Sequence, residues 1–238
     1  MHVARGRAAA TPEGLFENGL IKCQTRHYAA AAAMFEASAA LGHARAHAEL
    51  SWLLFHGRDG VPTNYRASFQ SAALASRLGC MHGSGVLAYH LTKGYGCGRN
   101  HARAAQLARA SAAAGSRFGQ YVTGFLHYCG YGGLMRDPVQ SFHYFHLAAS
   151  QGLDLAQCSL GDVYEDGHGV ARDPAEAMRW WTLAGAQGNP AACFVLGTQY
   201  ERRFGDFVQA RLWYQRAHDA GHQCAAVKLF HLGYIPQA

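Results

Sequence analysis

The sequence predicts an all-α solenoid built from about six helix-pair repeats of 36–37 residues each, because glycines recur in two series at that period. The first series opens four related loops at Gly57, Gly94, Gly130 and Gly167, with spacings of 37, 36 and 37 residues. The second series is Gly42, Gly79, Gly115, Gly152, Gly188 and Gly221, with spacings of 37, 36, 37, 36 and 33 residues. A fixed period of this length is typical of stacked repeats.

The stretch before each glycine of the second series has the pattern of an amphipathic helix, here named helix A. Apolar or small residues stand 11, 8, 7, 4 and 3 positions before the glycine. In the fifth repeat these are Ala177, Trp180, Trp181, Ala184 and Gly185. This spacing places them on one helix face, so helix A is expected to bury that face.

The stretch after each of these glycines predicts a second helix, helix B, with a column of small residues. Nine positions after the glycine stand Ser51, Ala88, Gly124, Gly161 and Gly197. A glycine inside a helix costs about 1 kcal/mol relative to alanine, so its recurrence needs a structural reason. We expect close helix–helix approach, with bulky side chains of helix A filling hollows in helix B.

The loops carry the signals of helix ends. A loop such as "YEDGHGVARDP" could in principle hold a phosphate or a metal ion, but it lacks the spacing of a P-loop or an EF-hand. Glycine suits the helix C-terminus, and a following proline suits the first helical position. The predicted N-caps are Asn64, Asn100, Asp137 and Asp173, with Pro138 and Pro174 directly after two of them, and a lone helix is expected to start at Thr11.

Composition restricts the class of protein. Half of the 238 residues are apolar and 15% are charged, which indicates a packed globular chain, and no apolar run is long enough for a spanning helix. The seven cysteines form no CxxC pair, and no N-x-[ST] acceptor occurs, so free thiols and a cytoplasmic location are expected. The N-terminal stretch is a poor signal peptide, although its arginines and alanines leave an organelle transit peptide as an alternative.

The units "AEAMRWWTLAGAQGNPAACFVLGTQYE" and "AQCSLGDVYEDGHGVARDPAEA" resemble the Sel-one-like repeat family, which is related to the tetratricopeptide repeat. The resemblance covers roughly Thr11–Tyr234 and implies a right-handed superhelix with helix A on its inner face. It implies one solenoid domain, 11–238, after a segment 1–10, with repeats near 27–63, 64–100, 101–137, 138–173, 174–207 and 208–238. Repeats one to three lack the aromatic pair, and the last loop, "ERRFGDF", is shorter and similar to an ordinary tetratricopeptide turn.

The resemblance implies a non-catalytic adaptor that binds a protein or peptide partner, and no residues remain for a separate catalytic domain. The expected binding surface is the polar side of helix A, opposite its buried stripe, although each of these side chains could also belong to a merely solvated face. The candidates are Arg66, Gln70, Arg77, Gln106, Arg109, His143, His146, Arg179, Thr182 and Gln215.

Charge is distributed unevenly along the chain. Residues 1–136 carry 14 basic and 5 acidic side chains, whereas residues 137–238 carry 7 and 10. No acid occurs from Gly60 to Arg136, and 18 of the 21 cationic residues are arginine, which suits carboxylate recognition. We therefore expect the N-terminal half to bind an acidic segment of a partner.

Two other classes of function stay open as alternatives. Helical-repeat RNA binding is compatible with the sequence pI near 9.0, and a β-lactamase-like hydrolase is the weaker alternative because the family's regular cysteine pairs are missing. No cofactor or metal site is expected. The pairs His43/His47 and His218/His222 have a possible metal spacing, but helix-end caps explain them better. The pair His143/His146 could make partner binding depend on pH.

Overall fold

The computed structural model describes residues 11–57 and 60–233, and in these residues the chain forms thirteen α-helices, one π-helix and no strand. The predicted all-α class is confirmed, while the predicted segment 1–10 lies outside the described residues. The helices are α1 (Pro12–Gln24), α2 (Tyr28–Ala40), α3 (Ala44–His56), α4 (Tyr65–Arg77), α5 (Met81–Lys93), α6 (His101–Ala113), α7 (Arg117–Cys129), α8 (Pro138–Ser150), α9 (Asp154–Asp166), α10 (Pro174–Ala186), α11 (Pro190–Gln199), η1 (Tyr200–Phe204), α12 (Phe207–Asp219) and α13 (Ala225–His231).

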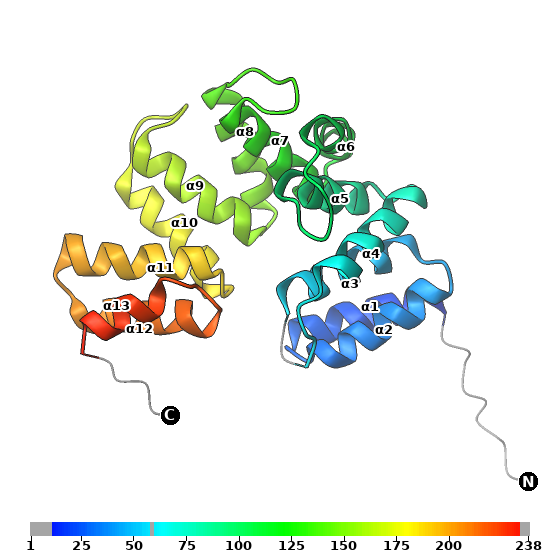
Figure 1. Ribbon diagram of the computed structural model, residues 1–238, viewed down its shortest axis with the longest axis horizontal. Coiled ribbons are helices and arrows are strands. Elements are labelled where there is room, and N and C mark those ends of the chain that lie inside the picture. Colours follow the sequence, from blue (N-terminus) through cyan, green and yellow to red (C-terminus); the bar gives the residue numbers. More distant parts are fainter. Residues whose placement is uncertain (1–10, 58–59, 234–238) are drawn as a thin grey trace, which may run out of the picture. The chain divides into compact units, whose positions relative to one another are not determined.

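The helices alternate as the repeat predicts. The even-numbered helices α2 to α12 are the A helices, the odd-numbered helices α3 to α13 are the B helices, and α1 precedes them. The chain divides into two compact units: unit 1 is Met1–Val122 with Tyr131–Leu134, and unit 2 is Thr123–Gly130 with Met135–Ala238. Consecutive helices pack against each other from α1 to α6 in unit 1 and from α8 to α13 in unit 2 (Figure 1).

The predicted helix ends are confirmed. All six junction glycines of the second series have φ between 79° and 86°, a left-handed conformation that glycine adopts without strain. Asn64, Asn100, Asp137 and Asp173 each cap the helix that follows them through a side-chain oxygen, and Thr11 caps α1. The loop after α9 therefore ends one helix at Gly167 and begins the next at Asp173, as expected.

In unit 2 the hollows of the B helices receive aromatic rings of the next A helix. A Cβ atom added at Gly161 would lie 2.5 Å from the Trp181 indole, which is only 2% exposed. A Cβ at Gly197 would lie 2.6 Å from the ring of the fully buried Tyr214. Gly124 meets Phe145 in the same way, at 2.9 Å. The expected packing of helix A bulk into helix B hollows is thus confirmed in three successive repeats.

Unit 1 has the same packing at Gly19, where an added Cβ would lie 2.5 Å from the Phe35 ring, but at Ser51 it has a buried polar contact instead. Ser51, in the column where unit 2 has glycine, donates to the Ser68 carbonyl oxygen at 2.8 Å. The Ser68 hydroxyl lies 2.9 Å from His90 Nε2, and His90 Nδ1 donates to the Tyr95 carbonyl oxygen at 2.9 Å. Because Nδ1 donates to that carbonyl, Nε2 of the neutral ring is an acceptor, and the single Ser68 hydroxyl proton lies between it and the Ser51 carbonyl oxygen, 2.7 Å from the hydroxyl oxygen. Burial lowers the pKa of His90, although the contact with Tyr95 acts in the opposite direction.

We expect this buried imidazole to make stability fall as the pH falls. The unfolded chain binds a proton at His90 near pH 6.5, whereas the folded chain binds it only at lower pH. The contribution is therefore complete above pH 6.5 and is lost progressively below it. Urea unfolding from about pH 7.5 to 5.5 should show a smaller loss of stability for His90→Gln, whose amide can keep both hydrogen bonds, than for the unchanged chain. Equal losses would contradict this assignment.

The helix-B side of unit 1 is its more tightly packed side. Helix α5 is buried continuously from Gly83 to Thr92, and α3 packs directly on it. The Trp52 ring of α3 lies 4.7 Å from the Phe118 ring of α7, with the rings edge to face. No comparable contact joins α4 with α6 along their described lengths. Helix A as the inner face of the superhelix stays a prediction.

The last loop differs from the ordinary turn that the sequence suggested. Tyr200–Phe204 forms a π-helical turn that continues α11, and it ends at Gly205, whose φ is 64°. The Gly205 amide donates to the Tyr200 carbonyl oxygen, the wide spacing of a π-helix. The expectation of an ordinary tetratricopeptide turn was therefore wrong. The shorter connection between α11 and α12 is made by a π-helical turn.

Candidate partner-binding surface

A groove on the helix-A side of unit 1 is the clearest cavity near the predicted surface. It encloses about 670 Å³ between α4 and α6, above a side chain of α5. The lining residues are Phe69, Gln70, Ala73, Leu74, Ser76, Arg77, Leu87 and Arg103. We name this cavity the α4–α6 groove. It can form because α4 and α6 do not pack directly against each other, whereas the B helices beneath them do.

The α4–α6 groove has an apolar floor and a basic rim. Leu87 is 4% exposed, and Phe69 is half-buried beside it in the lining. Gln70, Arg77 and Arg103 are exposed, and their side chains make no hydrogen bond or ion pair within the part of the chain that the structure describes. No carboxylate lines the groove, so these two guanidinium groups are available to an outside acceptor.

The structure brings together only two of the predicted candidates, Gln70 and Arg77. Arg66, Gln106 and Arg109 are exposed on the same two helices but do not line the groove. Arg103 does line it, and the sequence reasoning missed it because position 12 before the junction glycine was not assigned to the binding face. On the helix that position lies about 60° from the assigned position 9, at the edge of the assigned face, so a wider face would have included it.

The candidates in unit 2 contact their own helices. The Arg179 guanidinium donates to Glu176, the Thr182 hydroxyl donates to the Met178 carbonyl oxygen at 2.7 Å, and the Gln215 amide donates to Asp219 at 2.8 Å. His143 and His146 are exposed on α8, with the His146 ring 6.1 Å from the Trp180 ring. Their role in partner binding, including its dependence on pH, stays a prediction.

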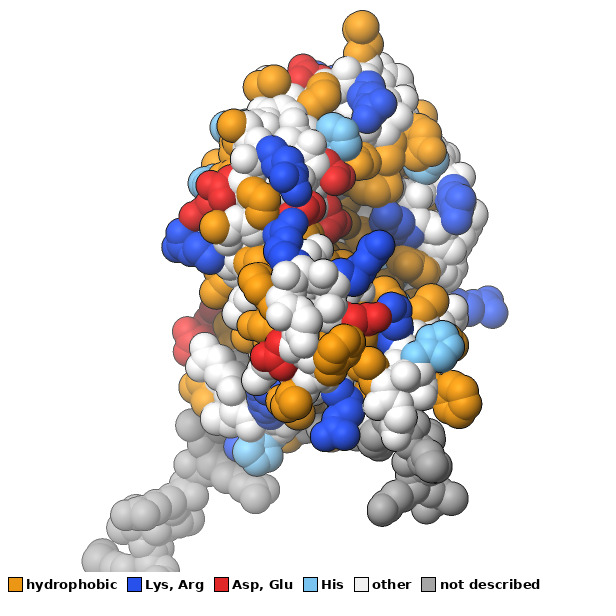
Figure 2. Space-filling view, turned by 90° about the vertical axis from the view of Figure 1, so that its left-hand side faces the viewer, with side chains coloured by type: hydrophobic (Ala, Val, Ile, Leu, Met, Phe, Trp, Pro, Cys, Tyr) orange, Lys and Arg blue, Asp and Glu red, His pale blue; other side chains and the backbone are white. Residues whose placement is uncertain are grey.

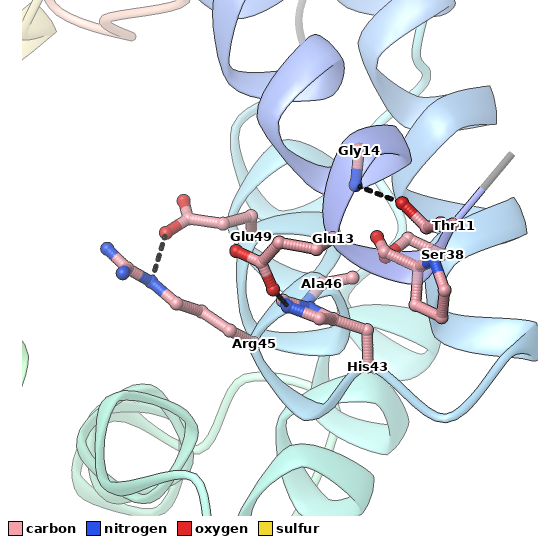
Figure 3. A network of polar contacts seen from close by, with 9 residues as sticks. Thr11, Glu13, Gly14, Ser38, His43, Arg45, Ala46 and Glu49 are labelled. Carbon is pink, nitrogen blue, oxygen red and sulfur yellow. Dashed lines mark hydrogen bonds and ion pairs between the residues drawn. The ribbon is translucent and has the colours of Figure 1, made fainter.

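His43 acts as a helix cap, as expected. Its Nδ1 accepts from the Ala46 amide at 3.2 Å, and its Nε2 lies 2.9 Å from Glu13 Oε2, so the ring joins α1 to the start of α3 (Figure 3). Arg45 points the other way, toward Glu49 at 4.0 Å (Figure 3). Among the described residues, no group of three or more histidine, cysteine or acidic side chains is arranged to hold a metal ion.

None of the seven cysteines, all of which lie in the described residues, forms a disulfide. Cys158 and Cys193 are buried, as expected for core fillers, whereas Cys97 and Cys129 are half-buried. Burial raises the pKa of Cys97, so its thiolate is disfavoured. Across the described residues, no helix has both the length and the apolar character needed to cross a membrane.

The Sel1 repeat model matches residues 44–80, 72–116, 118–153, 154–189 and 190–222, and the chain therefore belongs to the Sel1-repeat family. Four of the five matched units begin at a B helix and take in the following A helix, whereas the unit 72–116 begins within the A helix α4. Sel1 repeats generally mediate protein–protein interactions, and the family is generally of the non-catalytic, scaffold type. No curated protein matches the chain.

Solved Sel1-repeat structures resemble the chain over 80% to 94% of its length. The protective antigen c5321 of uropathogenic Escherichia coli is 26% identical with a TM-score of 0.57, and the match covers 94% of this chain and 49% of that one. A Sel1 repeat protein from Oxalobacter formigenes is 21% identical with a TM-score of 0.59, covering 94% and 92%. A putative Sel1 repeat protein from Klebsiella pneumoniae is 21% identical with a TM-score of 0.55, covering 80% and 93%. The chain thus spans about half of the antigen's length.

Proposed function

We propose that this chain is a non-catalytic interaction scaffold that binds an acidic segment of a partner protein in the α4–α6 groove. The single observation that carries the proposal is the basic rim above an apolar floor, with Arg77 and Arg103 free of internal acceptors. A guanidinium group recognises a carboxylate through two parallel hydrogen bonds, and the floor can bury an apolar side chain beside it.

The surroundings of the groove support an acidic ligand. The segment from Gly60 to Arg136 carries eight basic residues and no acid, so the partner's carboxylates meet no fixed negative charge there. Arg66 and Arg109 lie outside the groove lining and would attract the segment over a distance without contacting it. We propose a cytoplasmic location for the scaffold, since its seven cysteines form no disulfide. Neither RNA binding nor β-lactam hydrolysis gains support from the matched family or the similar structures.

The test is a titration of a fluorescein-labelled peptide of alternating glutamate and leucine, followed by fluorescence anisotropy. Reversing the charges at the rim with Arg77→Glu plus Arg103→Glu should weaken binding by at least about tenfold, because two charge-assisted hydrogen bonds are lost. The matched control is Arg66→Glu plus Arg109→Glu, which changes the net charge equally outside the groove lining.

We expect the control substitutions Arg66→Glu plus Arg109→Glu mainly to slow association of the peptide. The rim substitutions Arg77→Glu plus Arg103→Glu should mainly raise its dissociation rate. If both pairs weaken binding equally at every salt concentration, only general charge attraction is at work. In that case the α4–α6 groove is not the binding site.

A further inference from the structure

A second cavity lies in unit 2, beside the π-helical turn that the sequence did not predict. It is an open hollow of about 440 Å³, lined by Glu165 of α9, Thr198 and Gln199 of α11, and Arg202 and Arg203 of η1. Residues four apart in a helical segment lie on the same side of it, which explains why the pairs Thr198/Arg202 and Gln199/Arg203 share one cavity. We name it the η1 cavity.

The acids near the η1 cavity are already neutralised. Glu165 Oε1 accepts from Arg172 at 2.7 Å and from Arg203 at 2.8 Å. Glu201, also in η1, pairs with Lys228 at 3.0 Å and accepts from the Tyr214 hydroxyl at 2.5 Å. The lining therefore holds two guanidinium groups and one carboxylate, and that carboxylate is shared with Arg172 from outside the lining, so the lining keeps a net positive charge.

The donors facing the η1 cavity differ in how they are held. The Arg202 guanidinium and the Gln199 amide make no hydrogen bond or ion pair within the described part of the chain. Arg203 is oriented by its ion pair with Glu165, and the Thr198 hydroxyl is held by the Phe194 carbonyl oxygen at 3.1 Å. The cavity thus combines a fixed guanidinium with a free one, a pattern suited to an oxyanion. Lys and Arg side chains stand close to Asp and Glu side chains on the face drawn toward the viewer in Figure 2.

We propose that the η1 cavity binds a phosphate monoester group. Such a group carries a charge of about −1.5 to −2 at neutral pH, so the positively charged lining attracts it more strongly than it attracts a carboxylate, which carries a single charge. Its three oxygens can take hydrogen bonds from Arg202, Arg203 and Gln199 together. The volume exceeds that of the phosphate group alone, so there is room for the group that bears it.

The same chemistry could come from a phosphorylated side chain of a partner or from a small phosphorylated molecule. Calorimetric titrations of the full chain with inorganic phosphate, and with acetate at equal ionic strength, test the site itself. Titrations with a phosphoserine peptide and with glycerol phosphate then distinguish the sources, because the natural one should bind more tightly than phosphate alone.

We expect phosphate to bind in the millimolar range and more tightly than acetate. Arg202→Ala should weaken phosphate binding by at least about tenfold, since it removes a charge-assisted contact. Arg211→Ala removes an equally exposed arginine of the neighbouring helix α12 outside the cavity, and it should change nothing. Equal loss in both variants, equal binding of acetate, or no binding of phosphate at all would overturn the proposal. Arg202→Ala should leave binding of the acidic peptide to the α4–α6 groove unchanged, so the two proposals can fail separately.

Discussion

Replacing Trp181 by alanine is expected to lower the free energy of unfolding by about 3–5 kcal/mol, the range for removing a fully buried large side chain. The Trp181 indole fills the hollow at Gly161, and its Nε1 donates to Asp162 Oδ1 at 3.0 Å. The substitution removes the apolar contacts, leaves a cavity between α9 and α10, and takes away the donor of this hydrogen bond. Urea unfolding followed by far-ultraviolet circular dichroism measures the loss.

The neighbouring Trp180 gives a matched control for this substitution. It has the same side chain on the same helix but is only half-buried. Trp180→Ala should lower the free energy of unfolding by about 1–2 kcal/mol, clearly less than Trp181→Ala, because the Trp180 side chain buries less apolar area in the folded chain. Equal costs at the two positions would mean that the hollow of α9 contributes nothing particular to stability.

Replacing Gly197 by valine is expected to destabilise the chain by about 3 kcal/mol through overpacking. The new side chain would collide with the Tyr214 ring, 2.6 Å from the added Cβ. The ring cannot turn aside, because its hydroxyl is held by Glu201 at 2.5 Å and lies 3.2 Å from the Thr198 hydroxyl. Valine has a better helix propensity than glycine, so backbone effects alone would predict a small gain.

The control for Gly197→Val is Ala191→Val, at an exposed position of the same helix α11. It should cost no more than about 0.7 kcal/mol, the difference in helix propensity. Thermal unfolding of both variants gives the comparison. A stable Gly197→Val chain would show that α11 and α12 are not held as closely as the structure describes.

The repeats could be predicted from the sequence because glycine has few substitutes at their landmarks. A junction glycine such as Gly152 adopts a φ of 79°, which other residues adopt only with strain. A glycine in the hollow of a B helix, such as Gly161, stands where there is no space for a Cβ atom. Constraints of this kind act on single residues, so they are visible as columns in one sequence. The N-caps were predictable for the same reason.

Other features depend on several residues at once and were not predictable. The π-helical turn at Tyr200–Phe204 depends on the Tyr214 and Lys228 contacts of Glu201, which join residues 13 and 27 positions apart. The buried contact of Ser68 with His90 replaces an aromatic ring by two polar groups that meet only in the fold. No local pattern marks either feature.

The binding surface was predictable only in outline. Periodicity assigns exposed positions to helix A, but the groove forms where two A helices fail to pack against each other, a property of the stack rather than of one helix. For that reason Arg77 was predicted and lines the groove, Arg103 was missed, and Arg109 was predicted but lies outside the lining. The partner's acidic character follows from charge alone and stays a proposal.

The account depends most on the packing of helix A bulk into helix B hollows, and a double-mutant cycle of Gly161→Ala and Trp181→Ala tests it directly. In the unchanged chain, Gly161→Ala should destabilise, because its methyl group would meet the indole at 2.5 Å. In the Trp181→Ala background the same methyl group should stabilise by up to about 1 kcal/mol, because the hollow is empty and alanine is the better helix former. We therefore predict a coupling of at least about 1 kcal/mol between the two positions, whereas effects that add within about 0.5 kcal/mol would contradict the packing.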